Sequence, residues 1–366
     1  MERIRIVDVK LGKEELGNIT DAVKSGWISS KGKYIEMFEK GFSSYIGTKY
    51  GIASSNGTTA LHLALLAIGI GKGDEVIVPT LTNVANANTI AYTGARPVFA
   101  DSDSDYWCID PEDIRRRITK RTKALVVVHL YGHPCDMDAI TKIAKENDLY
   151  LIEDAAEAHG AEYKGRKIGT FGDISCFSFY GNKIVTTGEG GMCLTDNREL
   201  AEKMMILRNQ GTKPKESHGN RYWTDVIGFN YRLTNMQAAI GAAQIKKIGK
   251  VISDKRKMAS HYNKLLSNVE GVTVQPEMPW AKNVYWYYSI LVDKSKRSMV
   301  MERLDKEGIE TRPFFYPLHM LPMYNTGKNL PVAQELSVRG INLPSSPNLT
   351  KEEISYICGS IADILS

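Results

Sequence analysis

The chain has 366 residues, of which 43% are hydrophobic, and its 47 basic and 42 acidic residues give a net charge of +5. This length allows a large buried core and favours two domains over one. The charges form no long basic run, so the composition gives no support to binding of nucleic acid or of an anionic membrane surface.

No apolar stretch reaches the roughly 20 residues that a membrane span requires, and the polar start at residues 1–5 lacks the apolar core of a signal peptide. We therefore expect a cytoplasmic protein. The cysteines include no CxxC pair, which favours a reducing compartment and argues against a structural zinc site. We expect no bound metal and a packing role for the cysteines, which are Cys108, Cys135, Cys176, Cys193 and Cys358.

Short apolar runs alternate with helical patterns along the first two thirds of the chain. The runs are rich in β-forming residues and are bounded by Gly, Pro or Asp. This alternation is typical of an α/β fold with a mostly parallel sheet covered by helices. We expect strands at 76–78, 97–99, 124–128, 149–152, 174–179 and 191–194, and helices at 58–68, 83–92, 111–118, 136–147 and 198–208.

A helical pattern follows from residue 235 to about residue 266, and we place a domain boundary near residue 250. This gives a large domain of residues 1–250 and a smaller α+β domain of residues 251–366. In the smaller domain we expect an aromatic strand at 285–292, a helix at 295–307, a strand at 309–312 and a final helix that Thr350 caps.

Lys183 follows the predicted strand at 174–179 and runs into a glycine-rich turn, while Asp154 ends a strand 29 residues upstream. Taken alone, Lys183 would be a surface lysine. The aromatic approach and the tight glycine exit favour a buried site instead. A lysine amine in such a place suits formation of an imine with a pyridine aldehyde, so we expect pyridoxal phosphate as the cofactor. The amine, once displaced, could carry a proton between substrate and cofactor.

Asp154 lies at the carboxyl end of a strand, where open α/β sheets place ligand-binding residues. Its carboxylate would pair with the pyridine nitrogen and keep that nitrogen protonated. The alternative is a helix N-cap, because Ala155 and Ala156 follow. Glu157 lies one turn further on and could contact the 3-hydroxyl of the cofactor, or could be a solvated helical residue.

The glycine turn at residues 55–60 is the best candidate for phosphate binding. Gly57, Thr58 and Thr59 open an amphipathic helix, and the amides at a helix N-terminus favour an anion. The same residues are also typical of an ordinary turn with a helix N-cap and no ligand. Ser178 could add a hydroxyl to the phosphate, or could be a strand residue without a ligand.

Several segments together resemble the sugar-nucleotide aminotransferases of the DegT/DnrJ/EryC1/StrS family, and the resemblance covers essentially the whole chain. The segments are residues 56–62, 73–79, 153–157, 177–183 and 228–235. Within this family the chain looks most like the perosamine synthases, through residues 26–32, 128–138 and 312–319.

The resemblance implies a fold type I homodimer with active sites at the subunit interface. It also implies transfer of an amino group from L-glutamate to the 4-keto carbon of GDP-4-keto-6-deoxy-D-mannose, giving GDP-perosamine for a surface polysaccharide such as O-antigen. A UDP- or dTDP-linked keto sugar aminated at C3 or C4 is the alternative substrate. Whether dimers pair further into tetramers is left open.

By motif position, the resemblance assigns the imine to Lys183, the ring nitrogen to Asp154 and the ring hydroxyl to Glu157. It assigns the cofactor phosphate to Thr58, Thr59 and Ser178, and to Asn230 reaching across from the neighbouring chain. Glu157 stands where many relatives have glutamine, and Asn83 stands where relatives carry an aromatic residue that stacks on the cofactor ring. We therefore expect Asn83 to retain the cofactor less tightly than an aromatic residue would.

Candidates for substrate contact are cationic and aromatic residues, any of which could instead belong to the core or to an interface. They are Arg232, Trp286, Arg312, Tyr316 and His319. Two other functions are known for this kind of scaffold or compatible with it. A related dehydratase carries histidine in place of the imine lysine, which is intact here. A non-catalytic regulator on the same scaffold would not need the full set of imine, ring-nitrogen and phosphate groups.

Overall fold

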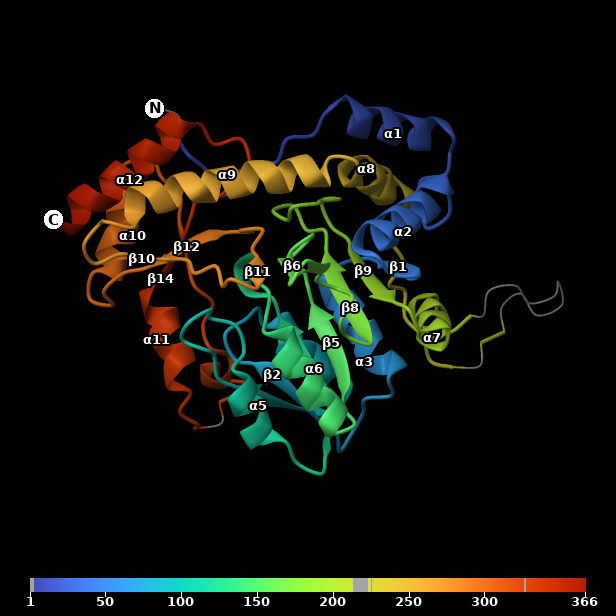
Figure 1. The fold of residues 1–366 in the computed structure, drawn as a ribbon. Coiled ribbons are helices and arrows are strands. Elements are labelled where there is room, and N and C mark those ends of the chain that lie inside the picture. Colours follow the sequence, from blue (N-terminus) through green and yellow to red (C-terminus); the bar gives the residue numbers. More distant parts are fainter. Residues whose placement is uncertain (1–2, 213–222, 225, 326) are drawn as a thin grey trace.

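The computed structural model describes residues 3–212, 223–224, 226–325 and 327–366 (Figure 1). Its centre is a seven-stranded sheet in the order β1-β9-β8-β5-β4-β2-β3, in which β9 alone runs antiparallel to its neighbours. This confirms the predicted mostly parallel sheet. The strands are β1 (Tyr50–Ser54), β2 (Glu75–Pro79), β3 (Arg96–Ala100), β4 (Thr122–Val128), β5 (Tyr150–Asp154), β8 (Ile174–Ser178) and β9 (Gly191–Thr195).

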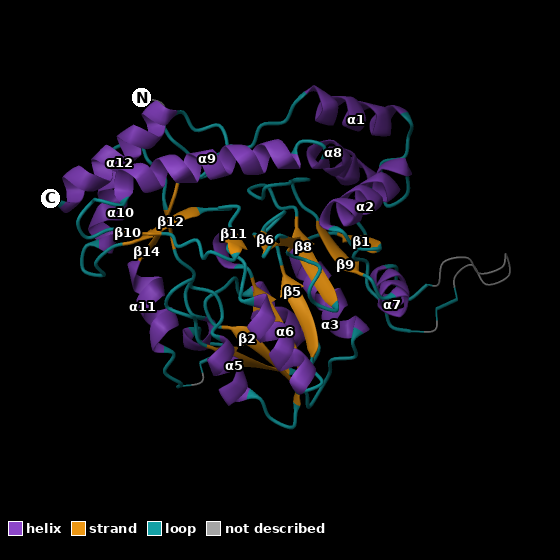
Figure 2. Cartoon of the chain, viewed as in Figure 1, coloured by secondary structure: helices purple, strands orange, loops and turns teal. Residues whose placement is uncertain are grey.

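Helices cover both faces of this sheet (Figure 2). Successive strand residues point to opposite faces, so in β4 Leu125 and Val127 enter one core while Ala124 and Val126 enter the other. The first core is covered by α1 (Lys13–Lys24), α2 (Lys33–Ile46), α5 (Pro111–Arg117), α6 (Met137–Glu146) and α8 (Asn235–Ile245). The second is covered by α3 (Gly57–Ala67), α4 (Ala85–Tyr92) and α7 (Arg198–Arg208).

A smaller antiparallel sheet lies in the C-terminal third of the chain, in the order β10-β12-β14-β13. Its strands are β10 (Thr273–Val274), β12 (Tyr288–Leu291), β13 (Arg312–Pro313) and β14 (Gly340–Leu343). This sheet packs against three helices through a third hydrophobic core. The helices are α9 (Ile248–Leu266), α10 (Arg297–Lys306) and α12 (Lys351–Leu365). The remaining elements are α11 (Pro331–Arg339), two single-turn helices at Leu130–Gly132 and Leu318–Met320, and a small sheet of β6 (Glu162–Tyr163), β7 (Arg166–Lys167) and β11 (Ala281–Lys282).

The predicted boundary near residue 250 falls inside α9, which continues across it (Figure 1). Ile248 and Ile252 at one end of this helix join the core of the large sheet, whereas Met258 and Tyr262 join the core of the small one. The N-terminal segment of the large domain also reaches the smaller domain, because Ile4 forms a β-bridge with Ile309 and packs in the core of the small sheet. A division into residues 1–250 and 251–366 therefore stays a prediction, and two segments link its parts.

The predicted strand at 285–292 is too long. The strand β12 begins at Tyr288, and Tyr285 has φ +49°, which is left-handed and not extended. The predicted strand at 309–312 is also displaced, because Ile309 pairs with Ile4 and β13 starts at Arg312. The capped C-terminal helix is confirmed, with reciprocal hydrogen bonds between Thr350 and Glu353.

Within the described ranges no helix is both long and apolar enough to cross a membrane. The same residues contain no cluster of three His, Cys, Asp or Glu side chains placed to hold a metal ion. All five cysteines are buried and none forms a disulfide.

Candidate active site

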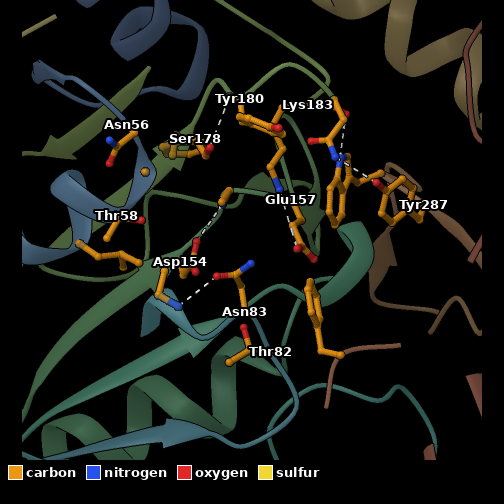
Figure 3. A pocket seen from close by; sticks show the side chains of 18 of the residues that line it. Asn56, Thr58, Thr82, Asn83, Asp154, Glu157, Ser178, Tyr180, Lys183 and Tyr287 are labelled. Carbon is orange, nitrogen blue, oxygen red and sulfur yellow. Dashed lines mark hydrogen bonds and ion pairs between the residues drawn. The ribbon is translucent and has the colours of Figure 1, made fainter. Parts of the chain in front are cut away.

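A cavity of about 660 Å³ lies where the parallel strands of the large sheet end. The segments that follow β1, β2, β5 and β8 form one side of it, and residues 286–287 and 312–316 of the smaller part form the other (Figure 3). Parallel strands bring their carboxyl ends to one edge of a sheet, which is why residues far apart in sequence meet here.

Lys183 projects into this cavity five residues after the end of β8 (Figure 3). Its Nζ lies 3.8 Å from Oε1 of Glu157 and 3.5 Å from the centre of the Trp286 ring. Burial lowers the pKa of Lys183, and the negative charge of Glu157 opposes that effect. A lysine shifted in this direction holds more of the neutral amine, which is the nucleophilic form.

Asp154 is the last residue of β5 and also lines the cavity. Its Oδ2 accepts a hydrogen bond of 2.8 Å from Nδ2 of Asn86, and its Oδ1 accepts one of 3.0 Å from the amide of Ala156. Burial raises the pKa of this carboxyl, so a cationic partner in the cavity would stabilise its charged form. No helix begins after Asp154, so the alternative of a helix N-cap is wrong.

Glu157 is buried in a turn, so the alternative of a solvated helical glutamate is also wrong. Its Oε2 accepts a hydrogen bond of 2.7 Å from the amide of Tyr131. Tyr131 has φ +53°, and the next residue, Gly132, has φ +100° with the amide of Trp286 2.9 Å from where a Cβ would lie. Burial raises the pKa of Glu157, which sets this carboxyl apart from an ordinary surface glutamate.

The N-terminus of α3 forms another part of the wall. Asn56 caps this helix by accepting from the amide of Thr59, whose hydroxyl is also bonded to Asn56. Thr59 is therefore occupied by the cap, whereas Gly57, Thr58 and Ser178 line the cavity. Gly57 approaches so closely that a Cβ there would lie 2.8 Å from Cβ of Ser178.

The far side of the cavity is aromatic. The rings of Trp286 and Tyr287 stack with centroids 4.0 Å apart. Asn182 is hydrogen-bonded to both residues. Its backbone carbonyl accepts from Nε1 of Trp286 at 2.9 Å, and its side-chain Nδ2 donates to the Tyr287 hydroxyl at 3.0 Å. Arg312 and Tyr316 line the mouth, as does Asn83, whose Oδ1 accepts from the amide of Ala85.

Besides Thr59, three of the predicted residues do not line this cavity. Arg232 donates to Ser30 and to Asn209, and buried His319 is bonded to Thr80 at 2.7 Å. In these positions neither Arg232 nor His319 lines the cavity, and their predicted contact with the substrate stays a prediction. Asn230 is exposed, and its predicted contact with a neighbouring chain stays a prediction.

The residues that sequence reasoning missed are Asn86, Tyr131 and Asn182. No spacing along the sequence points to these three residues, because each one contacts a site residue that is at least 26 positions away in the chain. The one sequence signal is the placement of Asn86 one turn after Asn83 in the predicted helix at 83–92.

These groups fit pyridoxal phosphate. The cavity offers a buried amine, a carboxyl whose pKa burial raises, and a helix N-terminus whose first amides have no acceptor within the helix. The fold and this site define a pyridoxal-phosphate-dependent enzyme of the α/β type.

A model of the DegT/DnrJ/EryC1/StrS aminotransferase family matches residues 9–362, and the chain belongs to this family. It is 47% identical to the GDP-perosamine synthase of Escherichia coli O157:H7, with 100% of both chains covered. It is 43% identical to that of Caulobacter vibrioides, covering 100% of this chain and 99% of the relative. The crystal structure of Streptomyces venezuelae DesV with a ketimine intermediate is 33% identical, with a TM-score of 0.93 over 99% of this chain and 98% of that one. The protein is thus a pyridoxal-phosphate-dependent sugar aminotransferase.

Proposed function

We propose that this protein transfers the amino group of L-glutamate to the 4-keto carbon of GDP-4-keto-6-deoxy-D-mannose, giving GDP-perosamine and 2-oxoglutarate. The observation that carries the chemistry is the buried Lys183 amine between Glu157 and the Trp286 ring. The similarity to GDP-perosamine synthases over the whole chain supports this choice of sugar, and a role in making a surface polysaccharide follows from it.

Each group around the cavity has a task in this reaction. Bound pyridoxal phosphate supplies an electron-withdrawing ring and a carbon that receives the amino group. Lys183 attaches the cofactor through Nζ and, when released, holds the migrating proton at that atom. Asp154 holds the ring nitrogen and Glu157 holds the ring hydroxyl.

The phosphate group of the cofactor would lie against the N-terminus of α3. Thr58 and Ser178 line the cavity there, and Gly57 lets the backbone approach. The positive end of a helix favours a dianion. Arg312 and Tyr316 at the mouth are the remaining candidates for contact with the substrate, and Trp286 with Tyr287 would close over it.

We also propose a cytoplasmic homodimer with shared active sites. The segment that contains Asn230 also presents Ile227, which is 88% exposed, and Val226 and Trp223, which are 49% and 65% exposed. Exposed large apolar side chains close together in sequence support a protein interface. Light scattering of the purified protein would give the mass of a dimer, and a monomer would contradict shared sites.

The test of the substrate is mass analysis after incubation with glutamate and a panel of GDP-, UDP- and dTDP-linked keto sugars. We expect the GDP sugar to gain an amino group, and Lys183→Ala to abolish turnover while leaving the fold, because the change removes the nucleophile and little of the core. An aminated UDP or dTDP sugar beside an unchanged GDP sugar would overturn the perosamine assignment.

Two controls separate the chemistry from simple cofactor binding. Borohydride reduction followed by peptide mapping should label Lys183 and no other lysine. Glutamate should bleach the visible absorbance of the loaded protein as the cofactor takes up the amine. A protein that binds cofactor and never bleaches would be a regulator built on this scaffold.

A further inference from the structure

Asn86 lies behind the cavity wall, in the first turn of α4, and is only 1% exposed. Its Nδ2 donates a hydrogen bond of 2.8 Å to Oδ2 of Asp154 and lies 3.2 Å from Oγ1 of Thr82. Resting on the proposed function, we infer that Asn86 is a positioning residue that keeps Asp154 ionised and aimed at the ring nitrogen of the cofactor.

The hydrogen bonds of Asp154 favour its ionised form. Both of its oxygens accept, one from Asn86 and one from the amide of Ala156. Donors of this kind bind a charged carboxylate more strongly than a neutral carboxyl, so both bonds oppose protonation of Asp154. The two bonds hold the carboxylate plane, and its remaining lone pairs lie at the cavity.

The orientation of the Asn86 amide agrees with this contact. Its Oδ1 is buried and has no hydrogen-bond partner among the described residues. An unpaired buried acceptor is unfavourable, so the amide holds this orientation only because the contact with Asp154 is worth more. The reversed amide would place Oδ1 against Oδ2 of Asp154, which is stable only when that carboxyl carries a proton.

Other charged groups also act on Asp154. Burial raises its pKa, while the Asn86 amide, Lys183 after β8 and His129 after β4 lower it. The charge of Asp154 in turn helps to raise the pKa of Glu157 and of the Cys176 thiol, after burial as the main cause. Lys183 changes its bonding during the proposed reaction, whereas Asn86 does not titrate, so Asn86 is the side-chain donor whose effect stays constant.

The test compares Asn86→Leu with Asn88→Leu, which removes an asparagine from the same helix. Asn88 accepts from the Tyr324 hydroxyl at 2.6 Å and does not touch Asp154, so its loss measures the cost to α4 alone. Cofactor retained after dialysis is measured by absorbance between about pH 4 and pH 9, and thermal unfolding is recorded for each protein.

In the wild type we expect retention to fall on acidification, when Asp154 takes up a proton and ceases to hold the ring nitrogen. Loss of a hydrogen bond to a charged group should move this fall upward by about one to two pH units in Asn86→Leu. It should also weaken cofactor binding at neutral pH by roughly tenfold to a hundredfold. Asn88→Leu should lower the melting temperature and leave unchanged the pH at which cofactor is lost on acidification, which we call the acid limb.

Asn86→Ala serves as a second variant, with the same expected shift, should the leucine prevent folding. An acid limb that is unchanged in both Asn86 variants, or shifted equally by Asn88→Leu, rejects the inference and leaves the proposed function intact. A wild-type protein that retains no cofactor at any pH rejects the proposed function, and the role of Asn86 with it.

Discussion

Individual side chains in this protein owe their chemistry to their immediate neighbours. Lys183 has a lowered pKa because it is buried, and Glu157 at 3.8 Å prevents a larger change. Glu157 in turn has one backbone donor, the amide of Tyr131, and its pKa is raised. Each of the two groups therefore stabilises the ionised form of the other.

By the family resemblance, Asn83 stands where we expect relatives to carry an aromatic residue. It lines the cavity and is exposed. We expect Asn83→Tyr to retain cofactor more tightly, by about 0.5–1.5 kcal/mol, because a ring can stack on the cofactor face. This corresponds to roughly twofold to tenfold slower loss on dialysis.

Asn83→Ala is the control for that experiment, since it also removes the hydrogen bond to the amide of Ala85 without adding a ring. Retention by the tyrosine variant that equals the wild-type value would reject a stacking role for this position.

At the scale of elements, the end of α3 depends on the absence of a side chain at Gly57. A Cβ there would lie 2.8 Å from Cβ of Ser178, so Gly57→Ala must push α3 away from the end of β8. Overpacking of this kind costs about 1–3 kcal/mol, and we expect cofactor binding to weaken roughly fivefold or more. Titration of the cofactor followed by absorbance measures the change.

Gly71→Ala is the matched control, because the nearest atom to its added Cβ is a backbone oxygen at 4.0 Å. It should bind cofactor as the wild type does. Equal affinities for Gly57→Ala and the wild type would mean that the close approach of α3 to Ser178 does not shape the phosphate site.

The elements themselves were largely predictable from the sequence. Most apolar runs of the large sheet are buried on both faces, so each run is nearly continuous and six of the seven strands lie within a few residues of their predicted places. The strand β1 (Tyr50–Ser54), at the edge of this sheet, was not predicted from the sequence. The strand predicted at 285–292 begins too early, because aromatic residues favour strands in general but here the first of them pack in a segment that is not a strand. The left-handed conformation of Tyr285 follows from its position beside Gly132, a contact across more than 150 residues.

At the scale of the whole molecule, α9 connects the two sheets, and Lys255 within it is buried. Its Nζ donates to the carbonyl oxygens of Trp286 and Ser345, and burial lowers its pKa to about 7. Between about pH 7 and pH 10 the unfolded chain therefore binds one proton that the folded chain does not. Stability should rise with pH across this window, by up to about 1.4 kcal/mol per pH unit.

Lys255→Met should remove that rise, since methionine does not titrate. We expect the difference in urea midpoint between the wild type and Lys255→Met to grow in favour of the wild type from about pH 7 to about pH 9. Lys257→Met is the control on the same helix, because Lys257 is an exposed ion-pair partner of Asp254. A parallel pH dependence in all three proteins would contradict a neutral buried lysine.

The sequence by itself determined the α/β class, the mostly parallel sheet, the cofactor and the reactive Lys183, because periodicity and strand-end chemistry are local properties of the chain. Only the tertiary structure decided which groups support them. The Asn86 contact with Asp154 spans 68 residues, and Arg232 and His319 are turned away from the cavity by partners on other segments. Such contacts depend on how separate helices and strands pack, and no spacing along the chain encodes that packing directly.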